Sequence, residues 1–277
     1  MGYANKLGND KTSSMKRMMC ATFLQIDAKD ADGNPVEGMY LSQLKFDGYQ
    51  DVEYFQSEGL SGFRVVKLTA TGGEEANYLW EDEYDEDSEK WSGGRWYHLE
   101  SEKYIGDDGE PDLLLGVGDA LWCYLPKKRT GSDGYTFCNA GEVLIDSQEI
   151  PVNTKTSSRK FGFGNMMNAA TVLSKVAFNG YQNVEYFQSE GLSGFRMIKL
   201  TSTGGEDANY VWEDEYDEDS EKWSGGVWYH LESEKYIGQD GEPDLEIQPG
   251  DALWCYAPKV RTGTKAYTVK YPGLNAK

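Results

Sequence analysis

The 277-residue chain lacks long apolar runs and is poor in basic residues and histidine. No stretch approaches the roughly 20 apolar residues of a membrane span, so membrane insertion is not expected. Lysine and arginine number 27 against 47 acidic residues, which gives a net charge of −20. Because phosphate recognition needs clustered basic side chains, nucleic acid is not an expected partner. The same charge disfavours attachment to anionic lipid.

Only two histidines are present, His98 and His230. A histidine beside Glu100 has the residue type needed for acid–base catalysis. However, no nucleophile motif, phosphate-binding loop or His/Cys metal cluster accompanies either histidine. The sequence therefore predicts a protein that is not an enzyme.

What the chain does contain is an internal repeat. Residues 48–131 recur as residues 180–263, with 70 of 84 positions identical. Lys11–Ser14 recurs as Lys155–Ser158, so each repeat begins before the near-identical block. We therefore predict two tandem domains, residues 1–146 and 147–277, with an inserted loop at about 27–38 in the first copy. No Gly/Ser-rich linker separates them, which suggests that they pack closely.

The composition favours strands. Aromatic residues make up 13% of the chain, including 19 tyrosines, and 32 glycines supply turns. Ala120–Leu125 is apolar on both alternating faces, so this strand should be covered on both sides. We predict an all-β protein with two tandem, near-identical β-sandwich or barrel-like domains and short helical turns.

Several short motifs carry a family resemblance. They are Phe178-Asn179-Gly180, an aromatic-rich middle with Trp-Tyr, and Pro-Gly-Asp-Ala-x-Trp from Pro249 to Trp254. Together with Gly2-Tyr3 and Phe161–Asn165, they resemble uncharacterised bacterial secreted proteins built from duplicated all-β modules. The resemblance implies an all-β fold and export to the extracellular space or cell surface, with the signal peptide already removed. It supplies no catalytic residues.

Two acidic segments are candidate Ca²⁺ sites, because Ca²⁺ takes six to eight oxygen ligands. The first is Glu81–Asp87 with its copy Glu213–Asp219, where a solvated acidic turn is the alternative. Its candidate ligands are Asp82, Asp85, Asp87, Asp214, Asp217 and Asp219. The second candidate set is Asp30, Asp32, Asn34 and Glu37, which lacks the full spacing of an EF-hand loop.

Four tryptophans are candidates for carbohydrate binding, because exposed aromatic rings on a sheet can stack on sugars. They flank Ser-Gly-Gly turns and are Trp91, Trp96, Trp223 and Trp228. The alternative for all four is a place in the core or an interface. Trp122 and Trp254 are predicted to be core residues.

The four cysteines allow several states. Cys123 lies opposite Cys138 across a predicted hairpin, so a bridge between them is sterically conceivable. Cys20 and Cys255 would then pair with each other or with a neighbouring chain. Four reduced, buried thiols are the alternative.

One turn differs sharply between the copies. Leu114, Leu115 and Val117 in the first copy face Glu246, Ile247 and Pro249 in the second. Apolar residues in only one copy predict that this turn is buried against the other domain or another subunit. Since nearly equivalent surfaces can also propagate head to tail, the sequence favours a self-assembling extracellular structural protein of a filament, lattice or surface layer. The alternative function is a carbohydrate-binding or adhesive module.

Overall fold

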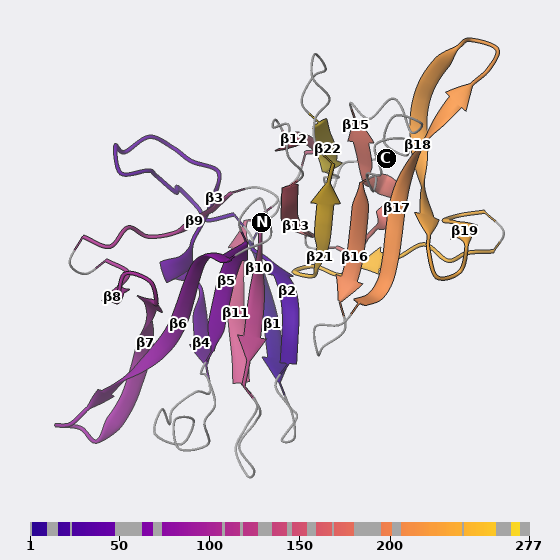
Figure 1. The fold of residues 1–277 in the computed structure, drawn as a ribbon. Helices are drawn as coiled ribbons and strands as arrows, with labels where there is room; N and C mark the ends of the chain where they lie inside the picture. Colours follow the sequence, from indigo (N-terminus) through magenta and orange to yellow (C-terminus); the bar gives the residue numbers. More distant parts are fainter. Residues whose placement is uncertain are drawn as a thin grey trace.

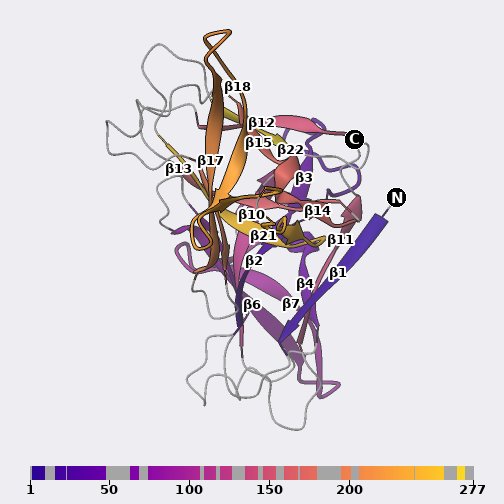
Figure 2. The same ribbon diagram turned by 90° about the vertical axis from the view of Figure 1, so that its right-hand side faces the viewer.

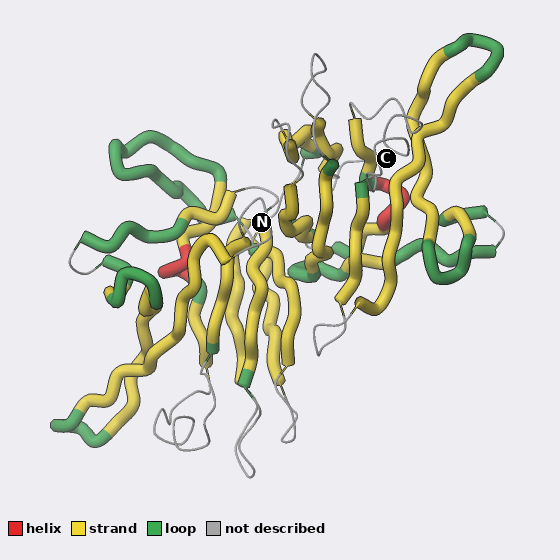
Figure 3. Tube along the Cα trace, in the orientation of Figure 1, coloured by secondary structure: helices red, strands yellow, loops and turns green. Residues whose placement is uncertain are grey.

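The computed structural model is all-β, and the residues that it describes include two short 3₁₀ helices. It describes residues 2–9, 16–22, 24–47, 63–68, 74–106, 109–116, 119–126, 135–142, 146–153, 159–167, 169–179, 195–200, 206–239, 241–258 and 267–271. Figures 1 and 3 show strands in both halves of the chain, and the short helical segments are red in Figure 3.

The first module contains a three-stranded sheet in the order β1-β11-β4, a six-stranded sheet in the order β2-β10-β5-β6-β7-β8 and the pair β3-β9. Its elements are β1 (Gly2–Asn9), β2 (Lys16–Ala21), β3 (Gly38–Tyr40), η1 (Leu41–Gln43), β4 (Lys45–Asp47), β5 (Arg64–Leu68), β6 (Glu74–Asp85), β7 (Lys90–His98), β8 (Lys103–Tyr104), β9 (Leu114–Gly116), β10 (Ala120–Leu125) and β11 (Tyr135–Glu142).

The second module repeats this arrangement strand for strand, as β12-β22-β15, β13-β21-β16-β17-β18-β19 and β14-β20. Its elements are β12 (Gln148–Asn153), β13 (Arg159–Gly164), β14 (Thr171–Val172), η2 (Leu173–Lys175), β15 (Ala177–Asn179), β16 (Arg196–Leu200), β17 (Glu206–Asp217), β18 (Lys222–His230), β19 (Lys235–Tyr236), β20 (Glu246–Ile247), β21 (Ala252–Ala257) and β22 (Tyr267–Tyr271). The prediction of two near-identical β domains is confirmed.

Each module has its own core, which lies against one face of its six-stranded sheet. In module 1, Trp80 and Trp96 meet edge to face at 5.2 Å, and Trp96 donates its indole N–H to the Leu44 carbonyl at 2.8 Å. In module 2, Trp228 donates in the same way to Val176 at 2.7 Å. A buried tryptophan needs such an acceptor, and η1 and η2 end where they supply it.

The modules meet through equivalent strands. Strands β2 and β10 contact β13 and β21, and the Ala21 amide donates to the Gly250 carbonyl at 2.9 Å. Figures 1 and 2 both place β2 and β10 beside β21. A Cβ on Gly162 would overlap that of Ala120, and a Cβ on Gly164 would overlap that of Ala21. The two glycines thus let the backbones approach closely, as the absence of a linker suggested.

The prediction that Leu115 is buried against the other domain or another subunit is wrong. Leu115 is fully buried in the core of its own module, and Met39 of β3 is its partner in the ladder. Ile247 is buried at the same place in module 2. Leu114 is half-buried, and Val117 lies outside the described residues. One apolar position in each copy therefore serves the local core, which removes this argument for a polymer.

Candidate functional site

The six-stranded sheet of each module carries a continuous row of side chains on the face opposite its core. Leu121, Cys123 and Leu125 of β10 point into the core, so the alternation of a strand places Tyr124 on the other face. Ladder pairing then links Tyr124 to Arg64 and Arg64 to Leu79. The row continues onto the next two strands.

There Leu79 pairs with Tyr97, and Tyr97 pairs with Tyr104. We call these five residues, together with Tyr256, Arg196, Val211, Tyr229 and Tyr236 in module 2, the outer rows. All ten side chains are half-buried, so each remains partly open to solvent. At about 4.8 Å between strands, five residues span about 19 Å.

Ring contacts order the aromatic end of each row. Tyr97 and Tyr104 lie edge to face at 5.1 Å, and Tyr229 and Tyr236 do so at 5.0 Å. The guanidinium of Arg64 lies over the Tyr124 ring at 5.0 Å. These contacts hold the rings in fixed orientations, which lowers the entropy cost of binding a ligand.

Hydrogen bonds fix the terminal tyrosines in their neutral form. Tyr104 donates its hydroxyl to Glu81 at 2.5 Å, and Tyr236 donates to Glu213 at 2.7 Å. The hydrogen bond to the carboxylate, followed by partial burial, raises the pKa of each tyrosine to about 12. Both phenols are therefore protonated at neutral pH.

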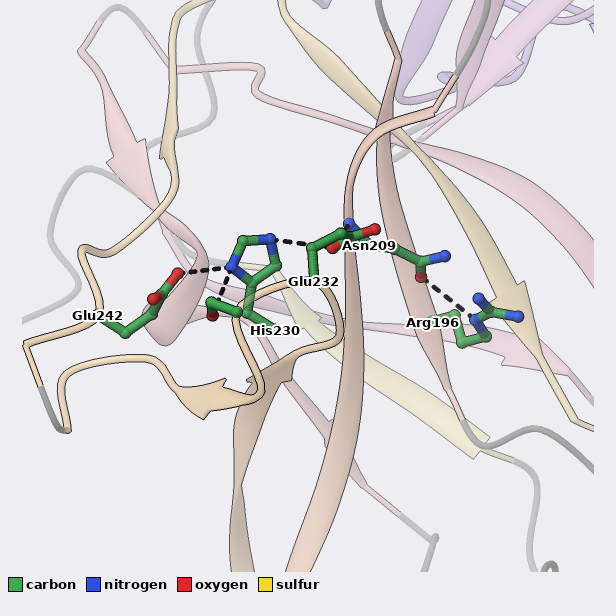
Figure 4. Close-up of polar contacts among 6 residues, drawn as sticks. Arg196, Asn209, His230, Glu232 and Glu242 are labelled. Atoms are coloured by element: carbon green, nitrogen blue, oxygen red, sulfur yellow. Dashed lines mark hydrogen bonds and ion pairs between the residues drawn. The ribbon is translucent and has the colours of Figure 1, made fainter.

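Arginine gives the rows a positive charge in an acidic protein. The Arg64 Nε donates to the buried Asn77 side chain at 2.6 Å, which anchors the guanidinium on the sheet. Arg196 donates to Asn209 at 3.3 Å in module 2 (Figure 4). Planar guanidinium groups held in this way match the geometry of carboxylates and other oxyanions.

The two histidines form a second duplicated constellation, shown for module 2 in Figure 4. The Nδ1 of His230 lies 2.5 Å from Glu242 and 2.9 Å from the Ser233 hydroxyl. Its Nε2 lies 3.0 Å from Glu232, and its ring stacks on Tyr210 at 4.6 Å.

Module 1 repeats this cluster. His98 lies 2.6 Å from Glu110, 2.9 Å from Ser101 and 2.8 Å from Glu100. The sequence indicated the pairing of His98 with Glu100 but missed Glu110, which follows His98 by twelve residues. Only the turn after β8 brings that carboxylate back to the ring.

Both ring nitrogens are thus occupied by carboxylates of the same module. Burial opposes ionisation of Glu242, but hydrogen bonds from His230 and Ser233 outweigh it and lower the pKa of that carboxyl. Each histidine thus joins the end of its strand to carboxylates of the turns that follow, and we call this cluster the histidine clasp.

The acidic segment of module 1 is only partly a turn. Strand β6 continues through Asp85 and β7 begins at Lys90, so residues 86–89 form the turn of a hairpin and are exposed. Asp85 accepts hydrogen bonds from the Ser88 side chain and from the backbone amides of Ser88 and Asp87, and these bonds lower its pKa. Asp87 and Asp219 are exposed, whereas the side chains of Asp82, Asp214 and Asp217 lie outside the description.

The Asp30 carboxylate also forms its hydrogen bonds within its own segment. Asp30 accepts the Asn34 backbone amide at 2.8 Å, the Asn34 side chain at 3.2 Å and the Asp32 amide at 3.0 Å, and these bonds lower its pKa. Glu37 is exposed. Among the side chains that the structure describes, no group of three or more His, Cys, Asp or Glu residues could hold a metal ion. Calcium binding stays a prediction.

The tryptophan predictions need correction. Trp96 and Trp228 are buried, with 2% and 1% of their surface exposed, and cannot stack on a sugar. The side chains of Trp91 and Trp223 lie outside the described part. Trp122 is half-buried on the outer face, as is Trp254 on its own sheet, and neither belongs to a core cluster. Tyrosines of the same strands would have been better candidates for sugar stacking, but the strand register that shows this is not given by the sequence.

The cysteine hairpin is also wrong. Cys123 lies on β10 in the six-stranded sheet, whereas Cys138 lies on β11 in the three-stranded sheet. Cys20 instead places its sulfur 2.7 Å from that of Cys123. Cys255 is buried in the core of module 2, and the Cys138 side chain lies outside the description.

Comparison with other proteins gives no further guide. No protein-family model, no curated protein and no solved structure matches the chain. In the described residues, no helix is long and apolar enough to cross a membrane.

Proposed function

We propose that this chain is a non-enzymatic extracellular binding protein whose outer rows bind an acidic polysaccharide. The observation that carries the proposal is the duplication of one row of tyrosine, arginine and an aliphatic residue across five adjacent strands. Tyrosine rings offer flat apolar faces with polar edges, which suits the alternating apolar and hydroxylated faces of sugars.

Charge favours an acidic polymer over a neutral one. Arg64 and Arg196 occupy equivalent places in rows that lie on a protein of net charge −20. Lys160 adds a further cation beside Tyr256 in module 2. A neutral glycan would leave these cations without a counter-charge from the ligand, whereas uronate carboxylates or sulfate esters would pair with them.

Two rows on one chain would make binding bivalent. Once one row holds a polymer, the second meets it at a high effective concentration, so weak contacts add up to useful avidity. Equivalent rows could also join two polymer strands. Such cross-linking would suit an adhesive protein of the cell surface or extracellular matrix.

A filament or surface-layer subunit is the second proposal. It is favoured by the presence of two nearly equivalent outer faces on each chain. However, the modules meet through equivalent strands, and contacts of this type close rather than propagate. Growth would therefore need another surface. Particle size by light scattering distinguishes the two proposals, since only a filament subunit should assemble without polysaccharide.

The binding test is affinity electrophoresis in gels that contain a polyuronate, a sulfated polysaccharide or neutral dextran. We expect retardation in the acidic gels, weakened by salt. Tyr97→Ala combined with Tyr229→Ala should abolish it, because both rows lose their central ring.

Leu99→Ser combined with Leu231→Ser is the matched control. Both leucines are exposed and lie just beyond the same strands, outside the rows. The control should be retarded like the parent protein. Equal retardation of the tyrosine variant, with an unchanged melting temperature, would contradict the proposal, as would retardation by dextran alone.

A further inference from the structure

Two thiols meet in the core of module 1. The sulfur of Cys20 lies 2.7 Å from the sulfur of Cys123, and both side chains are buried, with 0% and 1% of their surface exposed. Cys20 pairs with Leu121 in the ladder between β2 and β10, and Cys123 pairs with Met18. The cysteines are therefore diagonal neighbours on the core face of adjacent antiparallel strands.

The second module shows that the fold does not require this pair. Cys255 occupies the place of Cys123, but the strand opposite offers Phe163 where module 1 has Cys20. Phe163 is buried in the core of module 2 and fills that space with a ring. The two modules thus solve the same packing problem with a phenyl group in one and a second thiol in the other.

We propose that Cys20 and Cys123 form a disulfide that joins β2 to β10. Closing the bond requires the sulfurs to approach from 2.7 Å to about 2.05 Å. The inference rests on this contact alone and is independent of polysaccharide binding.

The oxidant is a low-molecular-weight disulfide such as oxidised glutathione. One cysteine thiolate attacks it, forms a mixed disulfide and releases one glutathione thiol. The second cysteine thiolate then attacks the mixed disulfide, closes the protein bond and releases the other thiol. The two cysteines are oxidised by two electrons, the glutathione disulfide is reduced by two, and their two protons end on the released thiols.

Burial determines when this exchange can occur. Burial, with the hydrogen bond to Cys20, raises the pKa of Cys123 well above its ordinary value, so little Cys123 thiolate is present in the folded module. Exchange should therefore take place while the chain folds, before β2 closes over the core. Once formed, the bond should resist reductants until the module unfolds.

The long sequence separation of the two cysteines makes the bond strongly stabilising. Residues 20 and 123 are 103 positions apart, and a cross-link that closes so long a loop strongly restricts the unfolded chain. We expect a melting temperature on the order of 10 °C higher in the oxidised protein than in the reduced protein.

The test is refolding of the full chain with a mixture of reduced and oxidised glutathione. Thiols are then alkylated in denaturant, and a non-reducing peptide map is recorded by mass spectrometry. We expect a peptide that joins Cys20 to Cys123, with Cys138 and Cys255 alkylated. Cys20→Ser should remove both the linked peptide and the difference in melting temperature between oxidised and reduced protein.

Cys255→Ser is the matched control, because its thiol occupies the place of Cys123 but faces a phenylalanine. It should retain both the linked peptide and the difference in melting temperature. The proposal is overturned if the parent protein refolds with four alkylated thiols. A link from Cys123 to Cys138, or from Cys20 to Cys255, would overturn it equally.

Discussion

Strands β2 and β13 occupy the same place in the two modules but differ at all six residues, LysArgMetMetCysAla against ArgLysPheGlyPheGly. Their partners β10 and β21 differ only at the last residue. The divergent strands β2 and β13 contact each other between the modules. Each of them packs against the other module, so the same sequence does not suit both strands.

At this contact a large side chain meets a small one. Met19 of β2 lies close to Gly162, and a Cβ there would lie 3.0 Å from the methionine methyl group. By ladder register, Met19 and Gly162 are equivalent positions, since each pairs with the corresponding tryptophan of the next strand. The comparison teaches that one copy supplies bulk and the other supplies space, and that this asymmetry allows equivalent faces to pack.

The largest effect should come from a residue at which the modules agree. Trp96→Ala or Trp228→Ala should each destabilise its own module by about 3–5 kcal/mol, because each change empties a fully buried site and orphans a carbonyl. Hydrogen exchange of β7 and β18 peptides measures each module separately, since Arg95 and Val227 distinguish the peptides. Costs that differ by more than about 2 kcal/mol would show that the two cores are not equivalent.

The next effect should come from the contact between the modules. Gly164→Ala places a Cβ 2.9 Å from the Ala21 Cα, and the cost should be about 1–3 kcal/mol because backbone must move. Gly116→Ala is the control, since its nearest non-adjacent atom would lie at 3.7 Å and module 2 has glutamine at that place. Thermal melts measure both variants. Equal melting temperatures for Gly164→Ala and Gly116→Ala would mean that the modules do not pack as described.

Acid should weaken the clasp around His230. Since the pKa of Glu242 is lowered from 4.5 on folding, its contribution is present above that pH and is lost as the pH falls through the folded value. Glu242→Gln should therefore reduce the loss of stability between pH 5 and pH 3, as followed by urea denaturation. Glu218→Gln, on an exposed turn, should leave the curve unchanged. A parallel loss in all three proteins would remove Glu242 from the acid response.

Much of the fold was predictable because the repeat constrains it. Identity over the block from Gly48 to Gly131 requires that both copies fold alike, and aromatic and glycine content identifies them as β. Strand order was not predictable, since β10 and β11 follow each other in sequence yet enter different sheets. The proposed bridge between Cys123 and Cys138 failed for this reason.

The candidate site was less predictable, because it depends on register. Trp96 and Tyr97 are neighbours in sequence, but strand alternation buries the first and opens the second. A shift of one residue would reverse their roles. Sequence can therefore identify the aromatic strands, but only the ladder decides which rings face solvent.

The smallest effect should come from the charged difference between strands β7 and β18. Arg95 lies over the Tyr104 ring at 4.4 Å, whereas Val227 stands at the equivalent place beside Tyr236. An exposed cation over an aromatic ring stabilises by about 0.5–1 kcal/mol, so Arg95→Val should cost no more than this. Val227→Arg should recover a similar amount in module 2, because Glu213 and Tyr236 already match Glu81 and Tyr104. Hydrogen exchange of the peptides that contain β8 and β19 measures the change in stability in both variants. If Arg95→Val instead costs several kcal/mol, the arginine supports more than the ring, and the two outer rows are not equivalent at this end.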